Sequence, residues 1–240
     1  MGKIIAGNWK MNKTNTESVE FVKNFIELVK KEDLVIIFPP ATSLKDVSTL
    51  LKDKAETGVQ NIFYEPKGAF TGEISAEMAL NAGASFVLIG HSERRQYFKE
   101  SNNVLNKKLK TAVKAGLKAV FCVGEKLDDH ANVEQVLTKQ LSALAGVNLT
   151  SVIIAYEPVW AIGTGVNATK ADIIKAHQFI RNYVAKSYGA EVKVLYGGSV
   201  NPENAKEILG QKVVDGVLVG GASLDVNKFA KLVEISRKIG

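Results

Sequence analysis

The sequence predicts an α/β protein that folds as one closed (β/α)8 barrel over residues 1–240. Short apolar runs recur eight times along the 240 residues, and segments with helical spacing of apolar residues separate them. No low-complexity linker or shift in composition marks a domain boundary. A doubly wound sheet would usually need fewer strands and an early Gly-x-Gly-x-x-Gly, which does not follow the first run.

The eight apolar runs are the expected strands. They are short and rich in β-branched residues, as parallel strands buried on both faces usually are. Their ranges are 3–8, 34–38, 57–61, 86–90, 118–123, 152–156, 193–196 and 216–219. In a closed parallel barrel the carboxyl ends of all strands meet at one face, so polar residues that follow the runs are the candidates for chemistry.

The segments between the runs are expected to form the outer helices. Apolar residues follow helical spacing over residues 19–29 and 171–184. Residues 169–172, Thr-Lys-Ala-Asp, have the spacing of a capping box. Residues 201–204, Asn-Pro-Glu-Asn, combine a cap with a first-turn proline, so we expect a helix to open there.

Composition narrows the class of protein. The net charge of +6 comes from lysines spread over many helical segments, so no nucleic-acid partner is expected. No apolar run is long enough to cross a membrane and no secretion signal is visible, so we expect a soluble cytoplasmic protein. The single cysteine, Cys122, lies in an apolar run and should be buried and inert. His130 and His177 have no metal-ligand spacing with it, so no metal is expected.

Polar residues at three strand ends predict an acid-base site. Glu157 follows the sixth run directly and enters the loop 158–165, which begins with proline and ends with glycine. This pattern is typical of a catalytic carboxylate beneath a lid, and the alternative is a strand-end acid in a surface turn. The first run ends in Asn8 and Lys10, and the fourth in His91. An amide, an ammonium and an imidazole would therefore share one face with the carboxylate.

Glycines follow the last two runs, at residues 197–198 and 220–221. Backbone N–H groups of glycines can approach phosphate oxygens closely, and barrels commonly bind phosphate at this place. We expect a helix to start over residues 222–225 and to add its positive dipole end. A glycine pair elsewhere would usually indicate only a tight turn.

Five segments resemble, in order, the motifs of the triosephosphate isomerase family. They are residues 6–12 (AGNWKMN), 68–73 (GAFTGE), 90–95 (GHSERR), 156–165 (YEPVWAIGTG) and 196–200 (YGGSV). The resemblance extends along essentially the whole chain and implies the TIM-barrel fold. It also implies cofactor-independent interconversion of D-glyceraldehyde 3-phosphate and dihydroxyacetone phosphate through an enediolate, in glycolysis and gluconeogenesis.

The resemblance implies roles for the strand-end residues. Glu157 matches the family's general base, His91 and Lys10 match its electrophiles, and Asn8 supplies an amide donor. In the family the histidine acts as a neutral imidazole whose pKa is lowered by a helix N-terminus, and residues 92–95 are placed to begin such a helix.

Glu93 has two interpretations. It is either a second acid near Lys10 or the first-turn acid that favours a helix N-terminus, and the resemblance favours a supporting role. Arg94 and Arg95 are expected to form structural ion pairs.

The resemblance also implies the phosphate contacts and the lid. The phosphate would be held by Gly163, Ser199, Gly220 and Gly221. The lid would comprise Pro158, Val159, Trp160, Ala161, Ile162, Gly163, Thr164 and Gly165. Its closure would grip the phosphate, exclude water and bring the base over the carbon.

A long loop over residues 61–74 carries an apolar tip, Phe70-Thr71-Gly72, that suits a docking loop. In the family this loop inserts into a second subunit, where the threonine braces the region around the catalytic asparagine and histidine. We therefore expect a homodimer, and the alternative is a mobile surface loop.

Two other functions compete with the isomerase: a phosphate-binding barrel with a different sugar phosphate, and a non-catalytic scaffold. Both are weakened because Glu157, His91 and Lys10 are all present. The chain departs from the family in being shorter around residues 125–130 and in carrying Val166 where lysine is frequent. These departures affect the trailing end of the lid and the helix after the fifth strand rather than the proton shuttle.

Overall fold

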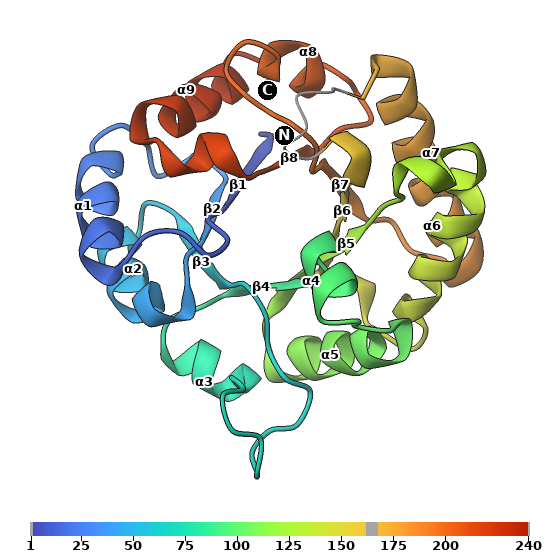
Figure 1. Ribbon diagram of the computed structural model, residues 1–240. Helices are drawn as coiled ribbons and strands as arrows, with labels where there is room; N and C mark the ends of the chain where they lie inside the picture. The colour runs from blue at the N-terminus through green and yellow to red at the C-terminus, as the bar shows by residue number, and fades with distance from the viewer. Residues whose placement is uncertain (1, 162–167, 240) are drawn as a thin grey trace.

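The computed structural model describes residues 2–161 and 168–239. Eight strands of this described chain form a closed parallel barrel in sequence order, with the last strand paired to the first (Figure 1). The strands are β1 (Ile4–Asn8), β2 (Val35–Phe38), β3 (Glu56–Val59), β4 (Phe86–Ile89), β5 (Lys118–Val123), β6 (Val152–Tyr156), β7 (Lys193–Tyr196) and β8 (Gly216–Val219). The predicted fold class is confirmed.

The α-helices surround the barrel as an outer ring, except α4, which lies inside that ring between α5 and the strands (Figure 1). They are α1 (Asn15–Phe25), α2 (Leu44–Leu51), α3 (Ala76–Asn81), α4 (Ser92–Tyr97), α5 (Asn102–Ala115), α6 (Val133–Leu141), α7 (Lys170–Tyr188), α8 (Ala205–Leu209) and α9 (Val226–Arg237). No helix within the described part of the chain is long and apolar enough to cross a membrane.

Two apolar layers hold the barrel together. The inner layer fills the barrel itself and consists of Ile4, Ala6, Ile36, Phe38, Phe86, Leu88, Val120, Cys122, Ala155, Leu195 and Leu218. The larger layer packs the outward faces of the strands against the helices. Cys122 is free and fully buried, as predicted, and burial raises the pKa of its thiol. The filled interior leaves only the two mouths of the barrel open to solvent.

The expected strand positions are confirmed, with the third strand at Glu56–Val59 in place of 57–61. The capping box at Thr169 is confirmed as well. The Asp172 N–H donates to the threonine hydroxyl oxygen at 3.2 Å, and the Thr169 N–H donates to the aspartate at 3.0 Å.

The expectation that a helix opens at Asn201 is wrong. The Asn201 side-chain oxygen accepts from the N–H groups of Glu203 and Asn204, which closes a turn, and α8 begins only at Ala205. Because an asparagine side chain bonds backbone groups two and three residues ahead in turns as well as in helix caps, the sequence signal does not separate the two.

The strand register brings the ends of neighbouring strands together at one mouth. Val123 pairs with Tyr156, and Tyr156 pairs with Tyr196. Past these pairs the Glu157 N–H donates to the Val123 carbonyl at 2.7 Å, and the Gly197 N–H donates to the Tyr156 carbonyl at 2.7 Å. The ladder therefore extends one step beyond the strands and fixes the backbone that carries the predicted base.

Candidate active site

The strand-end residues surround a cavity of about 530 Å³ at the carboxyl mouth of the barrel. Its lining includes every predicted catalytic residue except Glu93 and every predicted phosphate-binding residue that the structure describes: Asn8, Lys10, His91, Glu157, Ser199, Gly220 and Gly221. Gly197 and Gly198 also line it. Residues from five strand ends thus converge on one volume that can hold a small phosphorylated molecule.

Glu157 is almost completely buried, with 2% of its surface exposed. Its Oε2 accepts the backbone N–H of Ser92 at 3.0 Å, and its Oε1 lies 3.1 Å from Nε2 of His91. Burial acts to raise the pKa of the carboxyl, but the attraction of His91 and the hydrogen bonds from His91 and Ser92 lower it below its ordinary value. In this position the carboxylate is ionised and both of its oxygens are engaged.

His91 caps helix α4, so its ring lies between that helix and Glu157. The Glu93 backbone N–H donates to Nδ1 at 3.3 Å, which leaves Nε2 to carry the ring hydrogen that faces the Glu157 carboxylate. Burial acts to lower the pKa of His91, whereas the attraction and hydrogen bond of Glu157 raise it above its ordinary value. The direction of this shift is opposite to the lowered pKa that the family resemblance implies, and its cause is the Glu157 carboxylate. In the neutral form of the ring, Nδ1 accepts the fixed helix N–H and the hydrogen lies on Nε2.

Lys10 has a left-handed backbone, with a φ of 52°, which is uncommon for a residue with a side chain. Two hydrogen bonds hold it there. Its N–H donates to the Asn8 side-chain oxygen at 3.0 Å, and its carbonyl accepts from the Gln60 amide at 2.8 Å. Its ammonium lies 2.6 Å from Oε1 of Glu93. Backbone strain that is stabilised from two sides is a feature of functional sites.

Glu93 fits both interpretations that the sequence left open. It pairs with Lys10 and is also the first-turn acid of α4. Arg94 forms the expected ion pair, with Glu100 at 2.6 Å. Arg95 forms no ion pair with any residue that the structure describes. Its guanidinium instead donates to the carbonyls of Gly90 at 2.8 Å and Cys122 at 3.0 Å, which ties α4 to the barrel.

Sequence reasoning missed two residues at this mouth. Gln60 follows β3 and positions Lys10, as described above. Glu125 follows β5, is 1% exposed, and its Oε1 accepts from the Tyr156 hydroxyl at 3.1 Å and from the Trp160 indole N–H at 2.8 Å. Gln60 falls inside the expected strand 57–61, and Glu125 is separated from β5 by Gly124, so strand-end position alone could have marked only Glu125 as a candidate.

Only the first half of the predicted lid belongs to the described residues. Residues Val159–Ala161 form a single 3₁₀ turn, and the carbonyl of Ala161 accepts the N–H of Ser199 at 3.1 Å. The predicted phosphate ligand Gly163 lies outside the described residues, as do Ile162, Thr164 and Gly165. In this structure the loop after β7 is thus tied to the lid's first turn.

The expectation that a helix starts within residues 222–225 is wrong. A 3₁₀ turn, Gly221–Leu224, follows β8, and α9 begins at Val226 with Asp225 as its N-cap. The turn forms because the Ser223 N–H donates back to the Gly220 carbonyl at 2.9 Å. The N–H groups that open a 3₁₀ turn are unpaired within it, so they are available to an anion in the same way.

The predicted docking loop, between β3 and α3, projects away from the barrel at the bottom of Figure 1. Phe70 is 41% exposed while its ring centroid lies 4.7 Å from that of Phe63. Thr71 and Gly72 are exposed too. Among residues 2–161 and 168–239, no three His, Cys, Asp or Glu side chains are grouped so that they could hold a metal ion.

A parallel barrel that gathers a buried carboxylate, an imidazole and an ammonium around one cavity fits an isomerase of the aldose-ketose class. The family model for triosephosphate isomerase matches residues 3–236. The triosephosphate isomerase of Dictyoglomus thermophilum is 48% identical over 245 residues, covering 97% of this chain and 98% of its own. That of Caldanaerobacter subterraneus is 47% identical over 242 residues, covering 96% and 98%.

A solved structure gives the same result. The crystal structure of triosephosphate isomerase from Bartonella henselae superimposes with a TM-score of 0.90 at 40% identity, covering 99% of this chain and 100% of its own. The chain belongs to the triosephosphate isomerase family.

Proposed function

We propose that this chain interconverts D-glyceraldehyde 3-phosphate and dihydroxyacetone phosphate without a cofactor, with Glu157 as the general base. The observation that carries the proposal is the 3.1 Å contact between the carboxylate of Glu157 and the Nε2 of His91 in a cavity that Lys10 also lines. Family membership supports the substrate class.

In the proposed reaction Glu157 removes a proton from the carbon next to the carbonyl and returns it to the neighbouring carbon. Negative charge then develops on the carbonyl oxygen, and the barrier falls only if donors face that oxygen. His91 supplies its Nε2–H, Lys10 its ammonium and Asn8 its side-chain amide. Three donors of different reach can follow the charge as it moves between the two substrate oxygens.

Substrate binding must change the contacts of Glu157, because both of its oxygens are engaged in the structure. Moving the carboxylate from the Ser92 N–H and the His91 ring onto the substrate carbon removes the contacts that lower its pKa, and burial then makes it a stronger base. The same movement removes the carboxylate that raises the pKa of His91, which favours the neutral imidazole as donor.

We propose that the substrate phosphate binds at the glycine loops after β7 and β8. Gly221 has room for it, because a Cβ added there would meet no atom within 4 Å. We propose that Ser199, Gly220 and Gly221 bind the phosphate together with Gly163. Closure of residues 158–165 over the cavity would exclude water, and the Trp160–Glu125 hydrogen bond would be the fixed point of its first turn.

We propose that two copies of the chain dock through the loop around Phe70, Thr71 and Gly72. Met11, next to Lys10, is 97% exposed, and Phe98 at the end of α4 is 65% exposed. Exposed apolar side chains beside a catalytic residue favour a surface that a partner covers. A second copy would thereby shield the electrophile from water.

We further propose that residues 1–240 act as one domain in the cytoplasm, consistent with the single free cysteine. A different sugar-phosphate substrate would be expected to change at least one of the three acid-base groups. A scaffold protein would tolerate the loss of any of them. All three are present and in contact with one cavity.

The test is the steady-state rate at which purified chain converts glyceraldehyde 3-phosphate, measured with a metal chelator and no cofactor. Glu157→Asp retracts the carboxylate by about 1.5 Å, so turnover should fall by about 100-fold or more while substrate affinity changes little. Glu20→Asp, an exposed acid on α1, is the matched control. Near-native turnover of Glu157→Asp would refute the base, and a folded but inactive native chain would favour the scaffold.

A further inference from the structure

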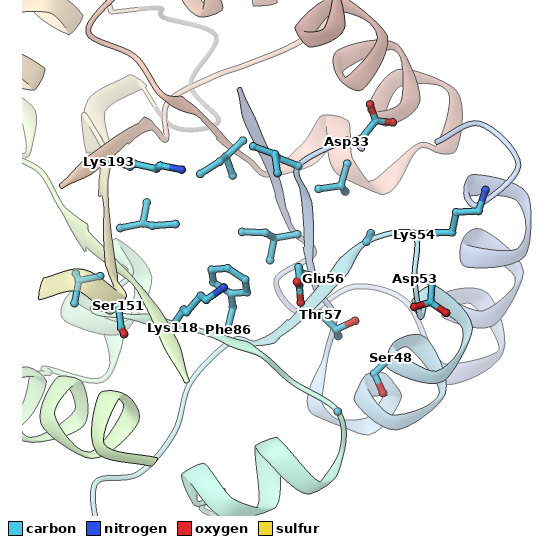
Figure 2. Close-up of a pocket in the computed structure, with 18 of the residues that line it drawn as sticks. Asp33, Ser48, Asp53, Lys54, Glu56, Thr57, Phe86, Lys118, Ser151 and Lys193 are labelled. Carbon is cyan, nitrogen blue, oxygen red and sulfur yellow. The ribbon is translucent and has the colours of Figure 1, made fainter. Parts of the chain in front are cut away.

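The amino-terminal mouth of the barrel, opposite the proposed active site, holds a second cavity of about 920 Å³ (Figure 2). It shares no lining residue with the cavity that contains Glu157. Small-molecule sites in proteins typically enclose about 300–1,000 Å³, so this volume is large enough for an organic ligand.

The centre of this cavity is apolar. Ile4, Ile36 and Phe86 belong to the inner layer of the barrel, and they line the cavity with only 5%, 4% and 6% of their surfaces exposed. Ile153, which is less buried, packs against the same layer. A flat apolar ligand placed on these side chains would remove both its own apolar surface and theirs from water.

Two lysines border the apolar centre. Lys118 and Lys193 are the first residues of β5 and β7, and Figure 2 shows their side chains directed inward over the pocket. The Lys118 ammonium lies 5.3 Å from the centre of the Phe86 ring. Within the described ranges neither ammonium lies within 4.0 Å of a carboxylate. Both cations are therefore available to an anionic group.

Two of the carboxylates that line the cavity have hydrogen-bond partners. Asp33 is paired with the guanidinium of Arg237, which is not part of the lining, at 2.7 Å from its Nε. Glu56 accepts the hydroxyl of Ser85 at 2.5 Å. Among the described residues the lining acids Asp53, Glu56 and Glu191 form no ion pair either, and the two lysines are the cations directed over the apolar centre.

We propose that this cavity binds a small organic anion with a flat apolar body, such as an aromatic carboxylate or sulfonate. The anionic group lies between the ammonium groups of Lys118 and Lys193, and the apolar body rests on Phe86 and Ile36. A triose phosphate does not suit the cavity, because its hydroxyls would find only apolar side chains at the centre.

The probe for this site is 8-anilinonaphthalene-1-sulfonate, whose fluorescence rises when it leaves water. The native chain should bind it saturably. The double variant Lys118→Gln/Lys193→Gln should bind about five- to tenfold more weakly, from the loss of two partly exposed charge contacts. Lys23→Gln/Lys114→Gln removes two exposed lysines from α1 and α5 and should bind within about twofold of the native chain.

Further readouts locate the bound probe. Dihydroxyacetone phosphate, which would occupy the opposite mouth, should not displace it, and both double variants should keep native isomerase activity. Ile153→Glu places an anion on the apolar centre and should abolish binding. The proposal is overturned if the native chain shows no saturable binding, if the two double variants bind equally, or if the triose phosphate displaces the probe. These outcomes are independent of whether the chain isomerises triose phosphates.

Discussion

His177 on α7 is a buried histidine outside the catalytic site, and replacing it should change how stability depends on pH. Its side chain is fully buried, and Nδ1 lies 3.2 Å from the Val213 carbonyl. Nε2 has no hydrogen-bond partner among the groups that the structure describes. Burial lowers the pKa of His177 to about 4, against the opposing hydrogen bond to Val213 and with a further lowering by Arg181.

The direction of the effect follows from proton binding. The folded chain binds the proton with a lower pKa than the unfolded chain, so protonation favours unfolding. The contribution of His177 to stability is complete above pH 6.5 and is lost as the pH falls toward 4. The difference between 6.5 and about 4 corresponds to about 3 kcal/mol in full, and to about 2 kcal/mol between pH 7 and pH 5.

The assay is urea unfolding at pH 7, 6 and 5, at one protein concentration, for the native chain and His177→Gln. The glutamine can still donate to the Val213 carbonyl but cannot gain a proton. The free energy of unfolding of the native chain should fall by about 2 kcal/mol more than that of the variant between pH 7 and pH 5. His91 is present in both chains, so its contribution cancels. Parallel pH curves for the two chains would refute the reasoning.

Three further changes test how the site is built. Gly124→Ala places a Cβ 1.7 Å from the carbonyl oxygen of Glu157, so it should shift the base and lower kcat by about 100-fold in a steady-state assay. Gln60→Ala removes the amide that holds the carbonyl of Lys10, so kcat/KM should fall about tenfold or more. Phe70→Glu places a charge in the proposed docking loop, so sedimentation should show monomers and activity should fall with them.

Each of these three predictions has an outcome that would contradict it, and the first two have a matched control variant. Gly2→Ala, whose Cβ makes only ordinary contacts, is the control for Gly124→Ala, and equal kcat values would contradict the steric argument. Gln135→Ala, an exposed glutamine, is the control for Gln60→Ala. Equal kcat/KM values for Gln60→Ala and Gln135→Ala would mean that the backbone of Lys10 keeps its position without the Gln60 amide. A dimer of Phe70→Glu with native affinity would place the subunit contact elsewhere.

The barrel could be predicted from the sequence because its strands are buried on both faces. A strand such as Phe86–Ile89 has no polar alternation to confuse it with a surface strand, and eight such runs leave few other topologies. Helix starts were harder to predict from the sequence. The box at Thr169 opens a helix while the similar pattern at Asn201 closes a turn, because the same local hydrogen bonds serve both structures.

The candidate site could be predicted where a polar residue follows a strand and matches a family motif, as Glu157 and His91 do. Gln60 was missed because it fell inside the expected third strand, and the contacts of Glu125 with Tyr156 and Trp160 have no signature in local sequence. The left-handed backbone of Lys10 was missed for the same reason. It is imposed by Asn8 and Gln60 and not by the lysine itself.

The most direct test of the proton shuttle is isotope exchange. In heavy water the native chain should place deuterium on the carbon next to the carbonyl of dihydroxyacetone phosphate, followed by NMR, because the proton held by Glu157 can exchange with solvent before it is returned. Glu157→Gln keeps the size of the side chain but cannot accept the proton, so exchange should fall to the rate in buffer alone. Exchange by Glu157→Gln at the native rate would contradict the assignment of Glu157 as the base.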